Sequence, residues 1–566
     1  MKWIKSPKID TKVSKELSDY PELIRQLLFN HGIKTKLSAV EFFNPSLSII
    51  PDPFELFDVK SAVERIEQAI SKSEQIYVFG DFDVDGITAS AILWEYLYRE
   101  RKAKVLPFIP SRVRDGYGMS DGCIQKIIDQ GGKLVITVDC GIRNVDLVKR
   151  FLDQIDFIIT DHHLPGEKIP QDIPVVLPMH PEGDYPYKQI SGAAVAWMLV
   201  AAMEKTRLKS KFNFGDLAGL DLVGISTITD MMPLNGINRV LTSLGLKQVR
   251  SFPRLGLRSL ADVSDVPINE LRAYHIGYVI GPRINAAGRI GDPIEPLRLL
   301  TTSKKDVAES IAGKLNSLNI ERKEMTQKIL DEARKIIEKQ KDEYLLFASG
   351  TGWAEGIIGL VAGKIQEEFN KPVVIVTEKG KSSRGSSRSI KGFNIVDAIE
   401  KSADLLEDFG GHAQAAGFSI DSKNIARFKK NLQALAKKEL KEEDLVKVVR
   451  SDAVVAVEEL NMELMDIIKQ FEPLGYGNKR PVFWVESAII TDVRGMSDNK
   501  HLRLSVKGAG NNDNPLSCVY FNCGDWLDKL ALGDCVDLLG HLDINDWNGN
   551  KELQFKIMDI HKHDVV

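Results

Sequence analysis

Residues 56–180 alternate between short apolar runs and helical segments, and this alternation constrains the fold more than any other feature of the sequence. We expect helices over 59–72, 87–101, 120–131 and 144–153, and strands over 75–80, 103–109, 133–139 and 155–160. Short apolar strands that alternate with helices predict a doubly wound parallel sheet. Ligands of such sheets bind beyond the carboxyl ends of the strands, so the residues that follow each strand are the first candidates for a functional site.

The whole chain of 566 residues is long enough for several domains. We expect an irregular N-terminal segment (1–55), an α/β domain (56–302), a long charged connecting helix (303–342), a second α/β domain (343–440) and a C-terminal all-β, OB-like domain (448–566). The second α/β domain is predicted to contain a basic loop over 379–392. In the last domain, short β-type runs are separated by Gly, Asn and Asp turns, which is typical of a small barrel.

Composition indicates a globular protein and excludes little else. The formal net charge is −4 and the sequence pI is about 6.3, so any nucleic-acid binding depends on local basic patches. The five cysteines include no CxxC pair, which favours a reducing compartment. The start of the chain lacks the apolar core of a secretory signal, and no apolar run is long enough to span a bilayer. We therefore expect a cytoplasmic protein with no membrane partner.

Three aspartates, Asp81, Asp83 and Asp85, follow the strand predicted over 75–80 and lie in the sequence GDFDVDG. Three carboxylates this close repel one another unless a cation lies among them. Hard cations such as Mg²⁺ and Mn²⁺ prefer oxygen ligands, and Mn²⁺ also accepts imidazole. Taken alone, the motif fits a metal site and a cluster of helix-cap and turn residues equally well.

Other segment ends carry further metal-ligand types. Asp139 follows the strand of VITVDCGI, Asp230 follows a later apolar stretch, and Asp161, His162 and His163 follow the strand of FIITDHH. A lone Asp139 or Asp230 is more often a cap or turn residue. Two adjacent histidines behind an aspartate are harder to explain in that way, and several segment ends that all offer Asp or His favour a metal centre.

The motifs DFDVDG, VDCG and TDHH resemble those of the DHH phosphoesterase superfamily. Six further motifs resemble, in order and spacing, those of the single-stranded-DNA exonucleases of that superfamily: PSRVRDGYGMS, SGAAVAW, TDMMPL, GPRINAAGRI, RGSSRSIKG and FGGHAQAAG. This resemblance extends from about residue 50 to the C-terminal β-domain. The resemblance implies two divalent cations, Mn²⁺ or Mg²⁺, held by Asp81, Asp83, Asp85, Asp139, His162 and Asp230. It implies that Asp139 bridges the ions, with Asp81 and Asp83 toward one and Asp85 toward the other. His163 would stabilise the scissile phosphate as a catalytic residue, and Asp161 would orient the histidines.

The basic segment 379–392 fits both a solvated loop and a phosphate cradle by composition alone. The resemblance implies that Ser386 and Arg388 contact the nucleic-acid backbone and that His412 lies near the bound strand. It also implies a 5′-phosphate pocket that includes Arg112, and a channel lined by Arg283, Asn285 and Arg289. Two positions depart from the family pattern: Cys140 replaces the usual Asn, and Glu355 replaces His or Gln.

The activity implied by the resemblance is 5′→3′ exonuclease digestion of single-stranded DNA to 5′-mononucleotides, in recombination and repair. A single-strand-binding protein and a RecQ-type helicase are the implied partners, and a monomer is expected. One alternative is a DHH phosphodiesterase of short oligoribonucleotides or cyclic dinucleotides, but those relatives are shorter than this chain. The other alternative is a non-catalytic replication scaffold, but such relatives lose metal ligands that this chain retains.

Overall fold

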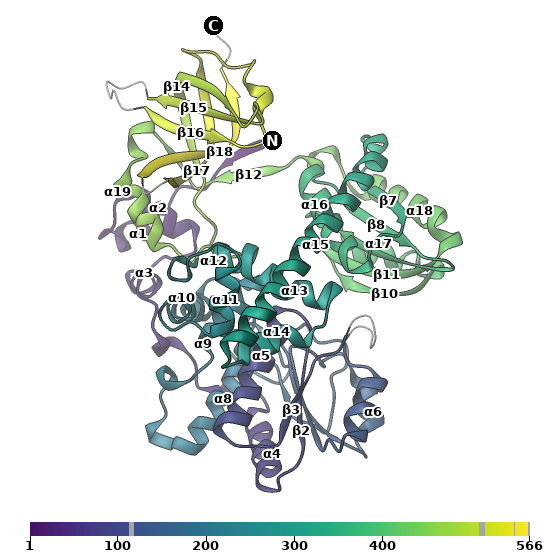
Figure 1. Cartoon of the computed structure of the whole chain (residues 1–566). Helices are drawn as coiled ribbons and strands as arrows, with labels where there is room; N and C mark the ends of the chain where they lie inside the picture. Colours follow the sequence, from purple (N-terminus) through teal and green to yellow (C-terminus); the bar gives the residue numbers. More distant parts are fainter. Residues whose placement is uncertain (112–117, 509–514, 548–549, 564–566) are drawn as a thin grey trace. The chain divides into compact units, whose positions relative to one another are not determined.

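The computed structural model describes the chain except residues 112–117, 509–514, 548–549 and 564–566 (Figure 1). It contains two compact units. The smaller unit comprises Met1–Lys2, Arg283–Asp292 and Ile311–Val448, and the larger unit comprises Trp3–Pro282, Pro293–Ser310 and Val449–Val566. No helix among the described residues is long and apolar enough to cross a membrane.

A five-stranded parallel sheet forms the centre of the first α/β domain in the larger unit. Its strands, in the order β3-β2-β4-β5-β6, are β3 (Val105–Phe108), β2 (Ile76–Gly80), β4 (Leu134–Val138), β5 (Asp156–Thr160) and β6 (Val175–Val176). Every residue of β2 and β4 is buried, as expected where helices cover both faces of a sheet. The predicted parallel sheet is confirmed.

Helices lie on both faces of this sheet, and α6 and α8 lie on opposite sides of it in Figure 1. The helices of the domain are α4 (Val59–Ser71), α5 (Val84–Glu95), α6 (Asp121–Asp129), α7 (Val145–Phe151), α8 (Gly192–Leu208), α9 (Leu220–Thr229), α10 (Gly236–Ser251), α11 (Leu255–Asp262), α12 (Ala273–His275) and α14 (Ile294–Thr301). Single π-helical turns follow α5 (Tyr96–Glu100) and α12 (Ile276–Ile280). Residues 84–93 of α5 are all buried, which places the start of this helix deep in the domain.

The C-terminal part of the larger unit contains the predicted OB-like barrel. Strands β14 (Phe483–Met496), β15 (His501–Lys507), β16 (Leu516–Tyr520), β18 (Asn550–Lys562) and β17 (Cys535–Trp547) pair in this order, and β17 pairs with β14 to close the barrel. Strand β13 (Ala453–Val455) and helix α19 (Met462–Gln470) precede it.

The prediction of an irregular N-terminal segment is wrong. This segment contains β1 (Lys2–Lys5), α1 (Thr11–Glu16), α2 (Glu22–Asn30) and α3 (Lys36–Phe43), and β1 pairs with β12 (Val448–Ser451). Leu27 and Leu28 of α2 are fully buried in the same hydrophobic core as Phe483 and Phe555 of the barrel. The segment is therefore ordered by contacts with residues more than 400 positions later in the sequence.

The smaller unit is built around a mixed sheet in which β7 and β8 are parallel and the other neighbours are antiparallel. Its strands, in the order β10-β11-β9-β8-β7, are β10 (Leu406–His412), β11 (Ala415–Asp421), β9 (Ser382–Arg388), β8 (Val373–Glu378) and β7 (Leu346–Thr351). Its helices are α16 (Glu355–Phe369), α17 (Ile395–Glu400), α18 (Ile425–Glu439) and most of α13 (Gly281–Ile290) and α15 (Lys305–Ile337). The prediction of a loop over 379–392 is wrong for Ser382–Arg388, because these residues form β9, an inner strand of this sheet.

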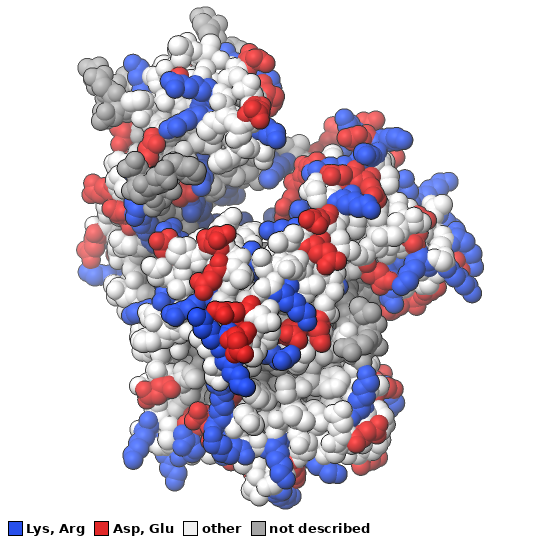
Figure 2. Space-filling model, viewed as in Figure 1, with Lys and Arg blue, Asp and Glu red and all other residues white. Residues whose placement is uncertain are grey.

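Lys and Arg side chains are interspersed with Asp and Glu side chains over the face of the molecule shown in Figure 2. This distribution agrees with the small net charge of −4. Because the average charge is uninformative, function must be sought in particular clusters of side chains.

Candidate metal centre and substrate-binding residues

Three carboxylates come together because neighbouring parallel strands end at the same level. Gly80 at the end of β2 is aligned with Val138 of β4, and Val138 is aligned with Thr160 of β5. The next residue in each case is an aspartate: Asp81, Asp139 or Asp161. Asp139 has a positive φ of 61°, which ends β4 and turns the chain away from the sheet.

Two glycines allow helix ends to approach these carboxylates closely. A Cβ at Gly86, in the first turn of α5, would lie 2.4 Å from the carbonyl oxygen of Asp81. A Cβ at Gly192, the first residue of α8, would lie 2.7 Å from the Cβ of Asp139. The glycines of DFDVDG and SGAAVAW are therefore required by close packing around the strand ends.

The N-termini of two helices hold Asp83 and Asp85 in place. Asp83 is the N-cap of α5 and accepts hydrogen bonds from the backbone N–H groups of Asp85 and Gly86. The Asp85 carboxylate accepts from the N–H groups of Gly192 and Ala193 at the start of α8, at 2.6 and 2.7 Å. It also accepts from the hydroxyl of Ser226 on α9 at 2.6 Å. These donors fix the orientation of a carboxylate that is only 1% exposed.

The six predicted metal ligands and His163 form three overlapping groups, in each of which the ligand atoms lie within 4.8 Å of one another. The groups are Asp81, Asp83 and Asp139; Asp85, His162 and Asp230; and Asp139, His162 and His163. His162 Nε2 is 3.0 Å from Asp139 Oδ1 and 3.5 Å from one oxygen each of Asp85 and Asp230. Asp139 belongs to the group with Asp81 and also to the group with His162, so its carboxylate lies between the two ends of the cluster.

Asp230 reaches this cluster from a helix, not from a strand. It is the C-cap of α9, which begins at Leu220 and ends at Thr229. The apolar stretch before Asp230 therefore forms a helix buried beside α5 and α8. Ser226, one turn earlier on α9, was not predicted as a site residue, and no motif distinguishes it in the sequence.

Burial and like charges raise the pKa of several of these carboxyl groups. Burial and the neighbouring Asp83 raise the pKa of Asp81 to about 7. Burial, with Asp85 and Asp83, raises the pKa of Asp230 to about 9, and burial with the same two aspartates raises the pKa of Asp139 well above its ordinary value. Without positive charge among them, these groups therefore resist ionisation together.

Three buried atoms at the centre of the cluster fit a metal ion. Asp139 Oδ1, His162 Nε2 and Asp230 Oδ2 have no hydrogen-bond partner among the described residues, although they converge on one another. Buried polar atoms are normally satisfied, so each unsatisfied atom needs an explanation. A set of carboxylate oxygens with one imidazole suits Mn²⁺, and the oxygens suit Mg²⁺.

His163 differs from His162 because its ring is outside the buried cluster. Its side chain is 54% exposed, and its Nδ1 lies 2.8 Å from Asp161 Oδ1. The hydrogen bond to Asp161 raises the pKa of His163 to about 9. Although burial favours the neutral form of Asp161, the hydrogen bonds from His163 and from the Ile142 N–H lower its pKa. The pair is therefore an anchored carboxylate beside an exposed imidazolium at neutral pH.

The structure places the predicted substrate-binding residues in the smaller unit, apart from Arg112, which lies outside the described residues. Ser386 and Arg388 lie on β9 and face Gly359 of α16, where a Cβ would lie 3.1 Å from Ser386 Oγ and 3.6 Å from Arg388 Nη2. Arg289 of α13 donates a hydrogen bond to the Gly356 carbonyl at 2.9 Å. These three residues are therefore gathered around the first turns of α16.

The other predicted residues of the smaller unit lie on different elements. Arg283 of α13 donates to the side chain of Asn316 at 3.0 Å, and Asn285 is half-buried on the same helix. His412 is exposed at the end of β10. Glu355, the first residue of α16, pairs with Lys379 at 3.5 Å on the surface.

The chain matches three family models. These are the DHH family N-terminal domain over residues 75–225, the DHHA1 domain over 342–438 and the RecJ OB domain over 451–559. The single-stranded-DNA-specific exonuclease RecJ of Bacillus subtilis is 35% identical over 545 residues, which are 95% of this chain and 67% of that protein. The RecJ of Salmonella typhimurium is 31% identical over 565 residues, which are 96% of both chains.

Solved structures are similar over the full length of this chain. The crystal structure of RecJ in complex with Mn²⁺ from Thermus thermophilus has a TM-score of 0.84 at 29% identity, and covers 100% of this chain and 80% of that one. The complex of the same protein with Mg²⁺ has a TM-score of 0.79 at 28% identity, and covers 100% and 79%. Relatives of this fold therefore bind the two cations that the ligand set suits.

Proposed function

Since the chain belongs to the RecJ family of single-stranded-DNA-specific exonucleases, we propose that it hydrolyses single-stranded DNA with the strand-end cluster as its metal centre. We define the strand-end cluster as Asp81, Asp83, Asp85, Asp139, His162 and Asp230. The observation that carries the proposal is the convergence of three buried and unsatisfied ligand atoms on Asp139, His162 and Asp230. We further propose that digestion starts at the 5′ end and releases 5′-mononucleotides.

We infer a division of the cluster between two divalent cations, Mn²⁺ or Mg²⁺. Asp81 and Asp83 would hold one ion, Asp85, His162 and Asp230 would hold the other, and Asp139 would bridge them, in agreement with the grouping of the ligand atoms. When bound, such cations lower the pKa of a water molecule and neutralise negative charge on a phosphate. The donors on α8 and Ser226 would keep Asp85 in position for this role.

His163 would act on the substrate phosphate. Its Nδ1 is held by Asp161, so its Nε2–H remains available as a donor from an exposed imidazolium. A positive donor of this kind stabilises the charge that develops on a phosphoryl oxygen. Asp161 is a positioning residue in this proposal, because its hydrogen bond holds the His163 ring in place and favours its charged form.

Phosphates of the DNA backbone would bind around the first turns of α16, to Ser386, Arg388 and Arg289. Further along the bound DNA strand, the contacts would be Arg283, Asn285 and His412. Arginine and small residues with accessible amides are common phosphate ligands. The predicted domain boundaries, the 5′-phosphate role of Arg112, a monomeric state and a cytoplasmic location stay predictions. A single-strand-binding protein and a RecQ-type helicase are proposed as partners on family membership alone.

End-labelled single-stranded DNA tests the proposal directly. With Mn²⁺ or Mg²⁺, we expect mononucleotide release from the 5′ end, and EDTA should abolish it. His162→Ala should abolish it too, whereas His180→Ala should retain it, because His180 is a buried imidazole of the same domain that stacks on Phe57. Digestion that continues in EDTA would refute the metal centre, and cleavage restricted to di- and trinucleotides would refute the assigned substrate.

A further inference from the structure

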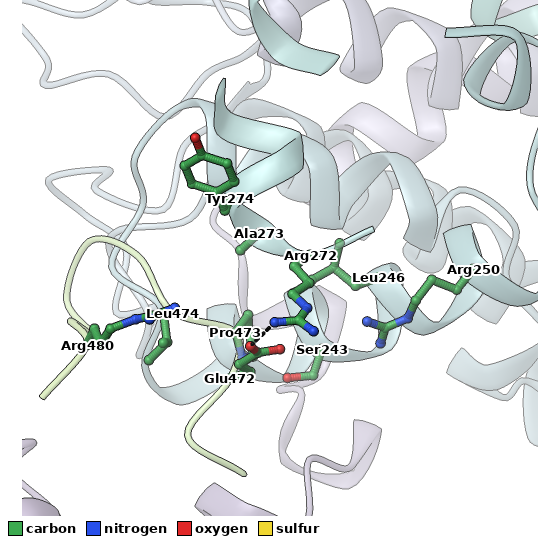
Figure 3. Close-up of a pocket in the computed structure, with 10 residues that line it drawn as sticks. All are labelled: Ser243, Leu246, Arg250, Arg272, Ala273, Tyr274, Glu472, Pro473, Leu474 and Arg480. Atoms are coloured by element: carbon green, nitrogen blue, oxygen red, sulfur yellow. Dashed lines mark ion pairs between the residues drawn. The ribbon is translucent and has the colours of Figure 1, made fainter. Parts of the chain in front are cut away.

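A pocket of about 140 Å³ lies in the larger unit where α10 and α12 meet the chain segment that leaves α19. The polar residues that line it are Ser243, Arg250, Arg272, Tyr274, Glu472 and Arg480. Figure 3 shows the Arg250, Arg272 and Ser243 side chains directed toward the same space beside Glu472. None of these residues belongs to the strand-end cluster.

The pocket carries more positive than negative charge. Arg480 is neutralised by Asp543 at 2.9 Å, and Arg272 is 3.7 Å from Glu472, a long ion pair. Arg250 donates only to the Leu271 carbonyl, and no carboxylate of the described residues forms an ion pair with it. Within the described part of the chain, one arginine charge is therefore left without a counter-ion.

Ser243 adds an unused donor to this charge. Its hydroxyl oxygen is buried and has no hydrogen-bond partner among the residues that the structure describes. The pocket therefore offers three donors: the Arg250 guanidinium, the weakly paired Arg272 guanidinium and the Ser243 hydroxyl. Such a donor set suits an oxyanion such as phosphate.

Two exposed tyrosines extend the pocket along the surface. Tyr274 lines the pocket and is 64% exposed, and Tyr278, one helical turn later, is 72% exposed. Their rings stack on each other with centroids 5.1 Å apart and an interplanar angle of 30°. Exposed aromatic rings beside arginines are typical of surfaces that bind the bases and phosphates of single strands.

The pocket lies along α10, beyond the end of this helix that follows Asp230 in the sequence. Asp230 lies six residues before the start of α10 at Gly236. Along that helix Ser243 is about two turns and Arg250 about four turns from its start, or roughly 10 and 20 Å. Any strand bound here would contact residues that do not belong to the strand-end cluster.

We propose that this pocket and the Tyr274–Tyr278 pair form an accessory site for single-stranded DNA, which holds a backbone phosphate in the pocket and a base against the tyrosines. The proposal rests on the proposed function, since it names a second contact of the same substrate. Glu472 competes with the phosphate for Arg272, so the site is attenuated by its own carboxylate.

Binding of a phosphorothioate-linked thymidine oligomer of about 20 nucleotides in Mn²⁺, measured by fluorescence anisotropy, tests the site. Tyr274→Ala and Arg272→Ala should each raise the Kd about fivefold to tenfold, whereas Tyr274→Phe should not. Of these substitutions, only Arg272→Ala should reduce the salt dependence of binding. The slope of the logarithm of the binding constant against the logarithm of the salt concentration should fall by about 1. Arg258→Ala is the matched control, because Arg258 is an exposed arginine of the neighbouring helix α11.

Glu472→Gln supplies a change of opposite sign. It removes the competing carboxylate and should tighten binding of the long oligomer about twofold to fivefold. A merely structural role for the Arg272–Glu472 pair predicts weaker or unchanged binding instead. An oligomer of about four nucleotides, too short to reach both sites, should respond to none of these substitutions.

The outcomes separate this proposal from the proposed function. If the wild-type protein digests DNA but the Tyr274 and Arg272 variants bind like Arg258→Ala, the accessory site is refuted and the exonuclease assignment stands. If inorganic phosphate or a mononucleotide displaces the long oligomer from wild type and from Arg272→Ala equally, the accessory site is refuted as well. If the wild type digests no DNA, the proposed function fails, and the anisotropy measurements still decide whether the site binds strands.

Discussion

Two clusters of polar side chains, one in each unit, differ in the sign of their charge: carboxylates dominate the first and arginines the second. The strand-end cluster gathers buried carboxylates, and two of their oxygens, Asp139 Oδ1 and Asp230 Oδ2, have no hydrogen-bond partner among the described residues. The deepest members, Asp85 and Asp139, are only 1% and 2% exposed. Around the first turns of α16, Arg289 and Arg388 each donate a hydrogen bond to a backbone carbonyl. In the proposed function the first cluster holds cations and the second binds phosphates of the DNA backbone.

The difference has consequences for stability as well as for binding. Like charges that are buried together destabilise the metal-free fold, so removal of one of them should increase stability and eliminate function. Arg289 and Arg388 are half-buried and each donates a hydrogen bond to a backbone carbonyl, so their replacement should affect substrate binding more than stability.

Asp139→Asn should have the largest effect. Asn accepts the positive φ of 61° at this position and has nearly the same shape, but it cannot bridge two cations. We expect a loss of exonuclease activity of more than about 1000-fold. The metal-free variant should be more stable than wild type at neutral pH, by about 1–2 kcal/mol.

Nuclease assays in Mn²⁺ and thermal melts in EDTA measure these two effects. Asp146→Asn is a suitable control, because Asp146 lies in the first turn of α7 and outside the cluster. A metal-free Asp139→Asn protein that melts below wild type would contradict the idea that repulsion strains the strand-end cluster.

Arg388→Lys should raise KM about tenfold with a smaller change in kcat. Lysine keeps the charge but loses the planar fork, which donates to the Ser387 carbonyl and extends toward Gly359. Arg427→Lys is the control, because this arginine of α18 is exposed and forms a long ion pair with Asp404, at 3.8 Å. Steady-state digestion of single-stranded DNA distinguishes the two, and an equal KM for both variants would remove Arg388 from the substrate site.

The larger sheet shows what a sequence pattern can predict about such a site. Alternation of strands and helices predicts parallel neighbours, and parallel neighbours of equal length bring Asp81, Asp139 and Asp161 to one edge. Asp230 could not be placed in the same way. It arrives from the end of α9, and only the packing of that helix against α5 and α8 brings it to the cluster.

The smaller sheet shows why pattern fails elsewhere. Segment 382–388 consists of Ser, Arg and Gly, a composition typical of loops, yet it is an inner strand. Its small residues are required because Phe418 of β11 packs over it, and a Cβ at Gly385 would lie 2.0 Å from that ring. Helix α2 was missed for a related reason, since the partners of Leu27 and Leu28 are barrel residues far along the chain.

Gly359→Ala should raise KM about threefold to fivefold by filling the space between α16 and β9. The added methyl would lie 3.1 Å from Ser386 Oγ and would displace the hydroxyl or a phosphate beside it. Gly363→Ala, one turn later on the same helix, meets no atom within 4 Å and should leave KM unchanged. Both alanines favour the helix, by up to about 1 kcal/mol, so a KM effect confined to Gly359→Ala cannot result from altered helix stability.

The smallest predicted effect is the pH dependence of stabilisation by metal. In the metal-free fold the pKa of Asp81 is raised to about 7 and that of Asp230 to about 9, both above the ordinary value of 3.8. The folded state therefore retains protons that the unfolded chain releases, and the free energy of unfolding falls as pH rises from about 4 to about 9. Bound Mn²⁺ replaces those protons, so it should raise the Tm by a few degrees more at about pH 8 than at about pH 5.5.

Differential scanning fluorimetry with and without Mn²⁺ measures this difference in Tm increase between the two pH values. Asp139→Asn should reduce the difference, while Gly363→Ala should not. An equal Tm increase at both pH values would mean that the strand-end carboxylates are not the groups that the metal relieves.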